Sequence, residues 1–306
     1  MSVRLDGRAA LVTGAARGIG AAIARELHAL GAAVVLVDNG VDIAGREPNT
    51  QPVEALAAEF GARGVALSAD IAAPGAAEAA VAETQARFGG LDIVVTAHAI
   101  LRDAFIFKAT RADWEEVLRV NLGGCFACCA AAAPIMRDQV KLGRDPGAIV
   151  NLVSSAGFYG NYGQAAYAAS KAGIFGLTRA AAFDLARSGV RCNAVAPFAA
   201  TRVTESIQAA NPEQAAYKAN ALRVPAAPVA RLVAYLASTQ AAAINGQLFA
   251  CRGREVFLFN QARPTTRVAV SNDTYPELDR AIATELAPRF TDLRTDLEAF
   301  SDPALI

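Results

Sequence analysis

The fold is decided by the stretch RAALVTGAARGIG, residues 8–20. Residues 8–13 form an apolar run with the length of a buried strand, and a glycine-rich run, 14–20, follows without a gap. A helical pattern then covers Ala21 to Leu30, and a second apolar strand covers Ala33 to Val37. This order of strand, tight turn, helix and strand predicts a βαβ unit, in which the crossover helix makes the two strands run parallel.

The glycine-rich run has the chemistry of a phosphate site. Gly14, Gly18 and Gly20 allow the backbone to turn tightly and to approach a pyrophosphate, and the start of the helix offers free N–H groups and a partial positive charge. Asp38, at the tip of the second strand, is placed to accept hydrogen bonds from the adenosine ribose and to repel a 2′-phosphate. The stretch therefore predicts a dinucleotide site that favours NAD over NADP, with Arg17 partly offsetting the repulsion.

Strand and helix patterns continue to alternate along the chain. We expect strands over 64–69, 91–96, 148–153, 191–196 and 247–250, and helices over 53–60, 75–88, 113–137, 160–187 and 228–238. This alternation predicts an α/β fold: a Rossmann-type doubly wound parallel sheet with helices on both faces. Ligands on such sheets bind beyond the carboxyl ends of the strands, where Asp38, Asp70 and Ser154 are all expected to lie.

The chain divides into one large unit and a tail. Residues 1–255 are expected to form the dinucleotide-binding and catalytic domain, with a helical lid at about 198–222, where the hydrophobic pattern weakens. Residues 256–306 are expected to form a C-terminal extension with a short strand and an amphipathic helix, Glu277 to Phe290. We expect this extension to pack on the same domain or on a neighbouring subunit.

Composition narrows the possible partners. The chain has 306 residues, a formal net charge of zero and 54% hydrophobic residues, which argues against nucleic acid or an anionic membrane as the main partner. The N-terminus is typical of a first strand and not of a signal peptide, and an odd cysteine count is typical of a reducing cytoplasm. Cys125, Cys128 and Cys129 lie in an apolar helical pattern, so we expect core packing and no metal site.

A second motif concerns proton transfer. Tyr167 and Lys171 are four positions apart, so a helix places both side chains on one face. A nearby positive charge favours the phenolate over the phenol, whose ordinary pKa is about 10. Ser154 stands thirteen residues before Tyr167, at the end of an expected strand. A hydroxyl, a phenol and an ammonium are therefore expected to meet at one point.

Together these motifs resemble the short-chain dehydrogenase/reductase family over roughly residues 5–255. The resemblance is carried by TGAARGIG at 13–20, Asp38, Asp70, Asn121, Ser154, YAASK at 167–171 and NAVAP at 193–197. It implies a nicotinamide cofactor on a Rossmann sheet and hydride transfer between that cofactor and an alcohol or carbonyl. Alignment on the family pattern without a gap selects Ser154, and not its neighbour Ser155, as the catalytic serine.

The resemblance also implies individual roles. Tyr167 would be the general base for alcohol oxidation or the acid for carbonyl reduction, and Lys171 would lower its pKa and hold the nicotinamide ribose. Ser154 would hydrogen-bond the substrate oxygen, and Asn121 would anchor a water that links Lys171 to solvent. Expected cofactor contacts are Gly14, Arg17, Gly18, Ile19, Gly20, Asp38, Asp70, Ile71, Ala97, Tyr167, Lys171, Pro197 and Thr201. Tyr159, Gln164 and Phe198 are expected to line the substrate entrance.

Longer segments are similar to one subgroup, the (3R)-hydroxyacyl-CoA dehydrogenases. These segments are NGVDIAGREP after Asp38, residues 100–124, residues 159–173 and APFAATRVTE at 196–205. The resemblance implies an acyl-CoA substrate from fatty-acyl or steroid side-chain metabolism, and a homodimer or homotetramer. A 17β-hydroxysteroid or other secondary-alcohol dehydrogenase, a 3-oxoacyl reductase and a non-catalytic nucleotide-binding subunit stay open as alternatives.

The chain departs from the family pattern at two places. The usual Asn-Asn-Ala-Gly turn after the fourth strand is replaced by residues 96–99, Thr-Ala-His-Ala, which brings His98 to the edge of the expected cofactor site. The usual glycine after Pro197 is replaced by Phe198, near the expected nicotinamide position.

Overall fold

A single eight-stranded sheet organises the chain, in the strand order β3-β2-β1-β4-β5-β6-β7-β8. The computed structural model describes residues 3–209, 212–270 and 274–306. The strands are β1 (Ala9–Thr13), β2 (Ala33–Val37), β3 (Gly64–Leu67), β4 (Ile93–Thr96), β5 (Ala148–Leu152), β6 (Arg191–Phe198), β7 (Leu248–Arg252) and β8 (Glu255–Leu258). Strands β1 to β7 pair in parallel, and β8 pairs antiparallel with β7. The predicted doubly wound parallel sheet is confirmed.

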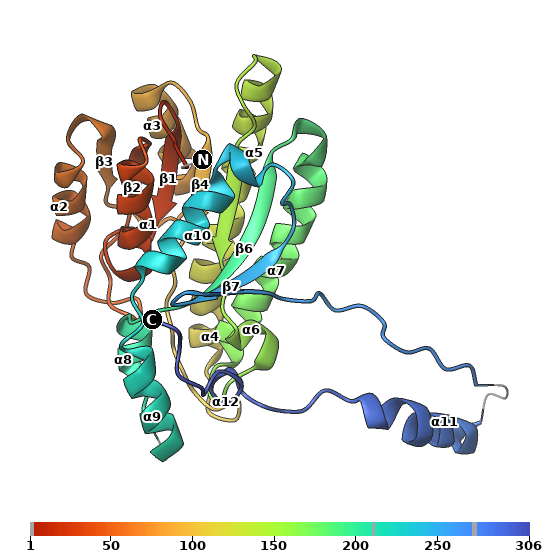
Figure 1. The fold of residues 1–306 in the computed structure, drawn as a ribbon. Coiled ribbons are helices and arrows are strands. Elements are labelled where there is room, and N and C mark those ends of the chain that lie inside the picture. Colours follow the sequence, from red (N-terminus) through yellow and green to blue (C-terminus); the bar gives the residue numbers. More distant parts are fainter. Residues whose placement is uncertain (1–2, 210–211, 271–273) are drawn as a thin grey trace.

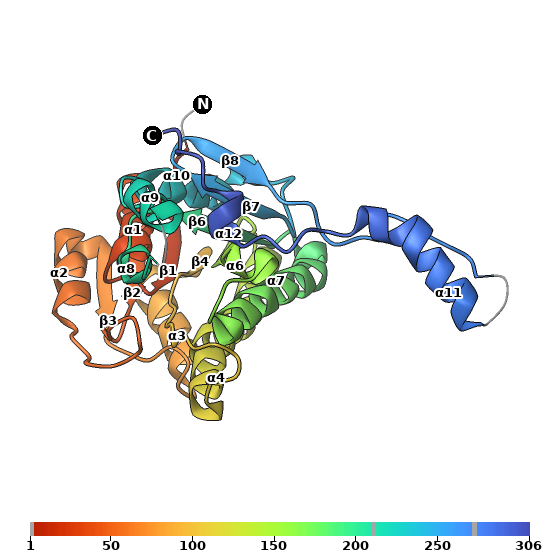
Figure 2. The same ribbon diagram turned by 90° about the horizontal axis from the view of Figure 1, so that it is seen from below.

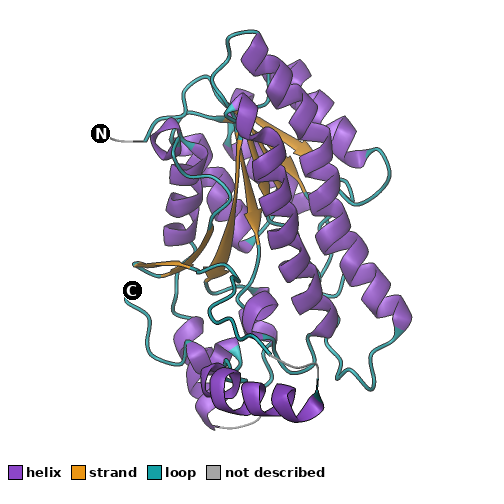
Figure 3. Ribbon diagram, turned by 90° about the vertical axis from the view of Figure 1, so that its right-hand side faces the viewer, coloured by secondary structure: helices purple, strands orange, loops and turns teal. Residues whose placement is uncertain are grey.

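Helices cover both faces of this sheet (Figures 2 and 3). One core cluster joins the sheet to α1 (Gly18–Ala29), α2 (Gln51–Glu59) and α10 (Ala227–Ala237). The other joins it to α3 (Ala76–Phe88), α5 (Gly124–Lys141) and α7 (Ala165–Leu185). Because successive strand residues point to opposite faces and both faces are buried, central strands such as β1 are apolar throughout.

The strand order creates the crevice in which ligands bind on such sheets. Strand β1 pairs with β2 on one side and with β4 on the other. The chain runs outward from β1 to β3 and then crosses back to β4, so the connections after β1 and β4 leave the sheet on opposite faces. The carboxyl ends of β1 and β4 therefore border an open crevice, which is the position expected for a dinucleotide.

The expected long helix over 113–137 is interrupted. It consists of α4 (Arg111–Leu118), a π-helical turn (Arg119–Gly123) and α5, which continues to Lys141. The interruption has a local cause, because the Asn121 side chain within the turn bonds both backbone groups of Ile100. By length and composition the stretch Arg111–Lys141 resembles a membrane span, as core helices of globular proteins also do.

Two further boundaries differ from expectation. Helix α1 begins at Gly18, three residues earlier than predicted, so two of the glycines lie inside its first turn. Strand β6 continues through Pro197 to Phe198. The proline is tolerated there because the pairing with β5 has ended at Val195, so no ladder hydrogen bond on that side is lost.

The lid range contains two short helices, α8 (Arg202–Ser206) and α9 (Pro212–Ala221), while residues 210–211 of that range lie outside the described residues. Figure 1 shows both below the carboxyl edge of the sheet.

The C-terminal extension leaves the body and returns to it. After β8 the chain runs outward to α11 (Tyr275–Ala281), which projects from the body in Figures 1 and 2. The predicted helix Glu277 to Phe290 is wrong in detail: α11 passes into a π turn (Ile282–Leu286) and a 3-10 turn (Ala287–Arg289). Pro288 accounts for the change, because it cannot donate a helical hydrogen bond. The chain then returns to form α12 (Asp296–Ala299) beside α6 (Ala156–Tyr159), which no sequence pattern indicated.

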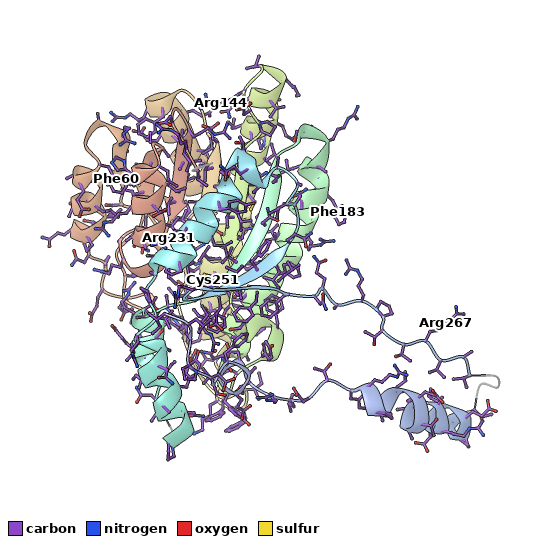
Figure 4. All side chains as sticks on the ribbon, in the orientation of Figure 1. Phe60, Arg144, Phe183, Arg231, Cys251 and Arg267 are labelled. Carbon is purple, nitrogen blue, oxygen red and sulfur yellow. The ribbon has the colours of Figure 1, made fainter. Side chains whose placement is uncertain are left out.

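At the opposite, amino edge of the sheet, a buried ion pair joins three strands. The Asp92 carboxylate accepts hydrogen bonds from the backbone N–H of Ala9, at 2.7 Å, and from two nitrogens of Arg144, at 2.7 and 2.6 Å. Asp92 is fully buried, and its backbone pairs with Ala9 and Ala148 at the starts of β1 and β5. Figure 4 shows Arg144 at the edge opposite to α8 and α9.

We therefore expect Asp92→Ala to destabilise the fold without altering the site at the other edge. The loss should be about 3 kcal/mol, because it leaves a partly buried guanidinium and a backbone N–H without their acceptor. Urea denaturation measures the free energy of unfolding. Asp145→Ala is the matched control, since that carboxylate is 74% exposed and should change stability by less than about 0.5 kcal/mol. Equal effects of the two substitutions would contradict this account.

Candidate active site

A cavity of about 990 Å³ lies over the carboxyl ends of the central strands. Its lining includes nearly all the residues predicted from the sequence: Gly14, Arg17, Gly18, Ile19, Gly20, Asp38, Asp70, Ile71, Ala97, Ser154, Gln164, Tyr167, Lys171, Pro197, Phe198 and Thr201. Two predicted residues, Asn121 and Tyr159, are not part of it. The size is in the range of cavities that hold cofactors and drug-sized ligands.

The glycine-rich turn fits a diphosphate. Gly14 has φ of +65°, and a Cβ there would lie 2.6 Å from the Cα of His98. A Cβ at Gly20 would overlap the carbonyl oxygen of Gly14. Helix α1 has no side-chain cap, so its first N–H groups remain available at the cavity wall. This combination of close backbone packing and free N–H groups suits an anionic ligand.

Asp38 has a structural task in addition to the predicted one. Its carboxylate accepts hydrogen bonds from the N–H groups of Ala16, at 2.8 Å, and Gly40, at 2.7 Å. It thereby braces the glycine-rich turn against the loop after β2, and lone pairs remain for a ribose hydroxyl. Arg17 donates to the carbonyl of Gly40 at 3.3 Å, which keeps the guanidinium at the same end of the cavity.

The structure brings Ser154, Tyr167 and Lys171 together. Ser154 follows the end of β5, and its hydroxyl lies near enough to Tyr167 to lower the pKa of the phenol. The Lys171 ammonium donates to the carbonyl of Leu152, at 3.0 Å, and lies 5.7 Å from the centre of the Tyr167 ring. Ser155 is directed elsewhere, because its hydroxyl donates to Asp296 at 2.5 Å. The geometry thus supports Ser154 over Ser155 as the serine beside the phenol.

Burial dominates the electrostatics of this trio. Tyr167 and Lys171 are 8% and 3% exposed. Burial raises the pKa of Tyr167 to about 12, the hydrogen bond from Ser154 lowers it, and the carboxyl groups of Asp296 and Asp103 raise it further. Burial also lowers the pKa of Lys171 to about 8. In the chain by itself the pKa of Tyr167 therefore lies above that of a free phenol, because removal from water outweighs the effect of Ser154. The lowering expected from Lys171 stays a prediction.

Asn121 lies behind the site. It is fully buried; its amide oxygen accepts from the N–H of Ile100 at 2.8 Å, and its amide nitrogen donates to the Ile100 carbonyl and to Ser170. With oxygen and nitrogen so engaged, the side chain holds the loop after β4 against α7. The observed task of this side chain is to position neighbouring segments, and the expectation that Asn121 anchors a water stays a prediction.

Two of the three residues expected at the substrate entrance line the cavity, and the third does not. Gln164 lines the cavity and donates to Asp103 at 3.0 Å, and Phe198 lines it with its ring centre 4.6 Å from that of Phe300. Tyr159 does not line it, because its ring packs edge-on against Phe259 and Phe300.

Sequence reasoning missed the residues that the C-terminal extension brings to the cavity. These are Thr295, Asp296, Leu297, Phe300, Asp302 and Ala304. Asp296 lies 141 positions after its partner Ser155, so no local pattern could have indicated the contact.

His98, at the unusual turn after β4, lines the cavity beside the glycine-rich turn. Its Nδ1 lies 2.6 Å from the Thr13 hydroxyl, and its Nε2 is buried without a hydrogen-bond partner. Burial, reinforced by the positive charge of Lys171, lowers the pKa of this imidazole to about 4. The ring is therefore neutral at physiological pH.

The cysteines behave as predicted for core residues. All five are free thiols and buried, and Cys125, Cys128 and Cys129 pack in the cluster under α5. Within the described part of the chain, no group of three or more His, Cys, Asp or Glu side chains is arranged to hold a metal.

Comparisons with known proteins agree with this geometry. Residues 14–253 match the family model described as enoyl-(acyl carrier protein) reductase. The chain is 38% identical over 276 residues to the hydroxyacyl-CoA dehydrogenase ChsB1 of Mycobacterium tuberculosis, covering 89% of this chain and 85% of that one. It is 40% identical over 255 residues to the (3R)-3-hydroxyacyl-CoA dehydrogenase of Mus musculus, covering 80% and 94%.

Two further comparisons extend the likeness. A 3-oxoacyl-[acyl-carrier-protein] reductase of Staphylococcus aureus is 38% identical over 251 residues, with 80% of this chain and 97% of that protein covered. A solved short chain dehydrogenase from Mycobacterium avium superimposes with a TM-score of 0.77 at 30% identity, covering 98% of both chains. The chain therefore belongs to the short-chain dehydrogenase/reductase family, and is an oxidoreductase that interconverts secondary alcohols and ketones with a nicotinamide nucleotide.

Proposed function

We propose that this protein is an NAD-dependent dehydrogenase that oxidises the 3-hydroxyl group of a 3-hydroxyacyl-CoA. The observation that carries the proposal is the trio Ser154, Tyr167 and Lys171, buried in one cavity that also contains the glycine-rich turn. Support for an acyl-CoA comes from the two hydroxyacyl-CoA dehydrogenases at 38% and 40% identity. The cavity has room for a cofactor and an acyl chain together.

The residues have distinct tasks in this reaction. The Tyr167 phenolate accepts the hydroxyl proton of the alcohol, and Ser154 donates a hydrogen bond to the substrate oxygen as its charge changes. Lys171 supplies a positive charge that favours the phenolate. Bound oxidised nicotinamide, held by Lys171 at its ribose, would supply the hydride acceptor for the carbinol carbon and a positive charge that favours the phenolate.

For the cofactor, the proposal is NAD. The residues proposed to contact it are those predicted from the sequence that line the cavity, with Asp38 at the adenosine end. The Asp38 carboxylate accepts hydrogen bonds from two backbone N–H groups, so it cannot move aside for a 2′-phosphate without losing those bonds. A 3-oxoacyl thioester reductase is the second candidate, favoured by the relative from Staphylococcus aureus. It uses the same trio in the opposite direction.

We also propose a homo-oligomer in the cytoplasm. The outer sides of α5 and α7 expose large apolar side chains, with Phe126 59% and Phe183 71% exposed. Figure 4 shows Phe183 pointing away from the body. Such a face suits a subunit interface. Five free cysteines are in keeping with a reducing compartment.

The first test of this function replaces the phenol. Tyr167→Phe keeps the ring but removes the proton-transfer group, so kcat for NAD-dependent oxidation of 3-hydroxyacyl-CoA substrates should fall by about 10² to 10⁴. The measurement is NADH formation at 340 nm with a panel of 3-hydroxyacyl-CoA and hydroxysteroid substrates. Ser155→Ala should retain far more activity than Ser154→Ala. Near wild-type turnover by Tyr167→Phe would refute the mechanism, and oxidation of steroids alone would refute the substrate class.

A second test concerns the cofactor. Asp38→Asn keeps a side-chain acceptor but removes the negative charge, so the preference for NAD over NADP in kcat/KM should fall by at least about tenfold. Asp42→Asn, on the same loop, is the control and should leave the preference in place. A wild-type enzyme that favours NADP, and keeps that preference in Asp38→Asn, would overturn the assignment.

A third test uses the buried ammonium. Because the folded-state pKa of Lys171 is lowered to about 8 from 10.5, the unfolded chain holds this proton between those pH values and the folded chain does not. The contribution of this group to the unfolding free energy therefore rises with pH across that window. Lys171→Met should be more stable than wild type below pH 8, by at most about 3 kcal/mol, and should lose this advantage towards pH 10.5.

Urea denaturation at a series of pH values measures this difference. The exposed Lys141, replaced by Met, is the control and should follow the wild-type pH dependence. A constant difference between Lys171→Met and wild type from pH 7 to 10.5 would show that the ammonium is not buried as described. The same Lys171→Met protein should be strongly impaired in turnover.

A further inference from the structure

Hydrogen bonds and an ion pair hold the C-terminal extension beside the active site. Arg252, at the end of β7 and 9% exposed, donates to the carbonyls of Phe300 at 3.0 Å and Asp302 at 2.8 Å, and pairs with Glu255 at 2.9 Å. The backbone N–H of Arg254 donates to the Leu305 carbonyl at 2.7 Å. The returning segment is thus tied to the β7–β8 hairpin of its own chain.

This fastening places α12 against the cavity wall. The Thr295 hydroxyl and the Glu298 carboxylate form a capping box that closes the first turn of α12. The Phe300 ring packs against Phe198, whose ring centre lies 4.6 Å away. Figure 2 shows α12 between β7 and α6, close to the start of α7. Asp296, the first residue of α12, therefore lines the cavity that contains Tyr167.

Asp296 has one engaged and one unengaged oxygen. The side chain is 94% buried, as its residue exposure is 6%. Its Oδ2 accepts from Ser155 at 2.5 Å, whereas its Oδ1 is buried with no hydrogen-bond partner. The Asn161 side chain and the backbone N–H of Leu297 lie near enough to lower the pKa of this carboxyl, but neither completes a hydrogen bond to Oδ1. Buried polar atoms are almost always paired, so Oδ1 can accept from a further donor.

The residues around Asp296 indicate which kind of donor group fits beside its Oδ1. Asp296 lies close enough to Tyr167 and to Tyr217 of α9 for its charge to raise the pKa of both phenols. Asp103, on the loop after β4, also lies close enough to raise the pKa of Tyr167. Asp296 belongs to the segment whose Phe300 packs on Phe198, at the expected substrate entrance, so the donor is assigned to the substrate. It must fit between acidic groups and phenols. A neutral N–H or O–H group meets this need, and a carboxylate on the substrate is disfavoured.

We propose that Asp296 is a specificity-determining residue: its Oδ1 accepts a hydrogen bond from an N–H or O–H group of the substrate, separate from the hydroxyl that is oxidised. This inference rests on the proposed function, because it takes the ligand at Tyr167 to be the substrate. Two sources share the chemistry. One is an amide N–H of the pantetheine arm of a thioester, and the other is a second hydroxyl on the acyl or steroid portion. A substrate without the donor leaves Oδ1 unpaired and is selected against.

The test uses Asp296→Asn and two matched pairs of substrates. An amide oxygen can still accept from Ser155, while the amide nitrogen replaces the free acceptor by a donor. The first pair is a 3-hydroxyacyl N-acetylcysteamine thioester and its N-methylated form, which lacks only the amide N–H. The second is a substrate with a second hydroxyl and its deoxy form. The readout is the ratio of kcat/KM within each pair.

Wild type should favour the donor-bearing member of at least one pair by about tenfold or more. That ratio should approach one in Asp296→Asn, and the affected pair identifies the source of the donor. Glu298→Gln is the matched control on the same helix, because glutamine still serves a capping box and Glu298 does not line the cavity. It should keep the wild-type ratio. An unchanged ratio for both pairs in Asp296→Asn overturns the inference.

Binding separates this inference from the proposed function. Dissociation constants of the ketone forms, measured by calorimetry with oxidised cofactor present, require no turnover. If wild type binds the donor-bearing member of a pair more tightly and Asp296→Asn does not, the inference is supported. This holds even if wild type oxidises neither pair, and in that case only the proposed function fails. No discrimination by wild type in either measurement overturns the inference. Should Asp296→Asn fail to fold by thermal unfolding, Ser155→Ala, which frees the carboxylate from its orienting bond, should reduce the same ratios.

Discussion

The arrangement of the active site depends on the burial of one ammonium. Lys171 is 3% exposed, and a charge removed from water is tolerated only where fixed dipoles and neighbouring groups receive it. The Leu152 carbonyl, at the end of β5, accepts its hydrogen bond at 3.0 Å. The strand end therefore determines where the ammonium lies, and the helix spacing of four residues places Tyr167 beside it. Because the phenol is buried as well, its pKa rises to about 12, so the protein alone holds the tyrosine protonated.

The substrate side of the site is shaped by segments distant in sequence. The two serines that follow β5 have different neighbours. Ser154 lies near the Tyr167 phenol, and Ser155 donates a hydrogen bond to Asp296 of the C-terminal extension. Arg252 holds that extension through two backbone carbonyls, and the Phe300 ring adds a side-chain contact with Phe198. A tail of this kind can change its inward-facing residues while the sheet and the cofactor site stay the same. The glycine-rich turn and the lining residues of the extension therefore come from separate parts of the chain.

Much of the fold could be predicted from the sequence, because burial on both faces leaves continuous apolar strands and the helices between them keep a regular period. Strand β2 was predicted at its observed bounds. The break in the helix at Asn121 could not be predicted, because it depends on two hydrogen bonds to Ile100, 21 positions away. Tyr159 was placed at the entrance by its proximity to Tyr167 in sequence, but its ring packs against aromatic rings of the C-terminal extension outside the cavity.

The sequence by itself determined the family, the parallel sheet and the positions of Ser154, Tyr167 and Lys171, because these follow from local spacing and from residue types that the backbone geometry requires. Only the tertiary structure decided how burial shifts the two pKa values and that Asp296 enters the cavity. Those properties arise from removal of water and from contacts across as many as 141 positions, and neither is encoded in any short stretch. The stretch 8–20 was sufficient to predict the cofactor side of the crevice, whereas the substrate side had to be assembled by folding.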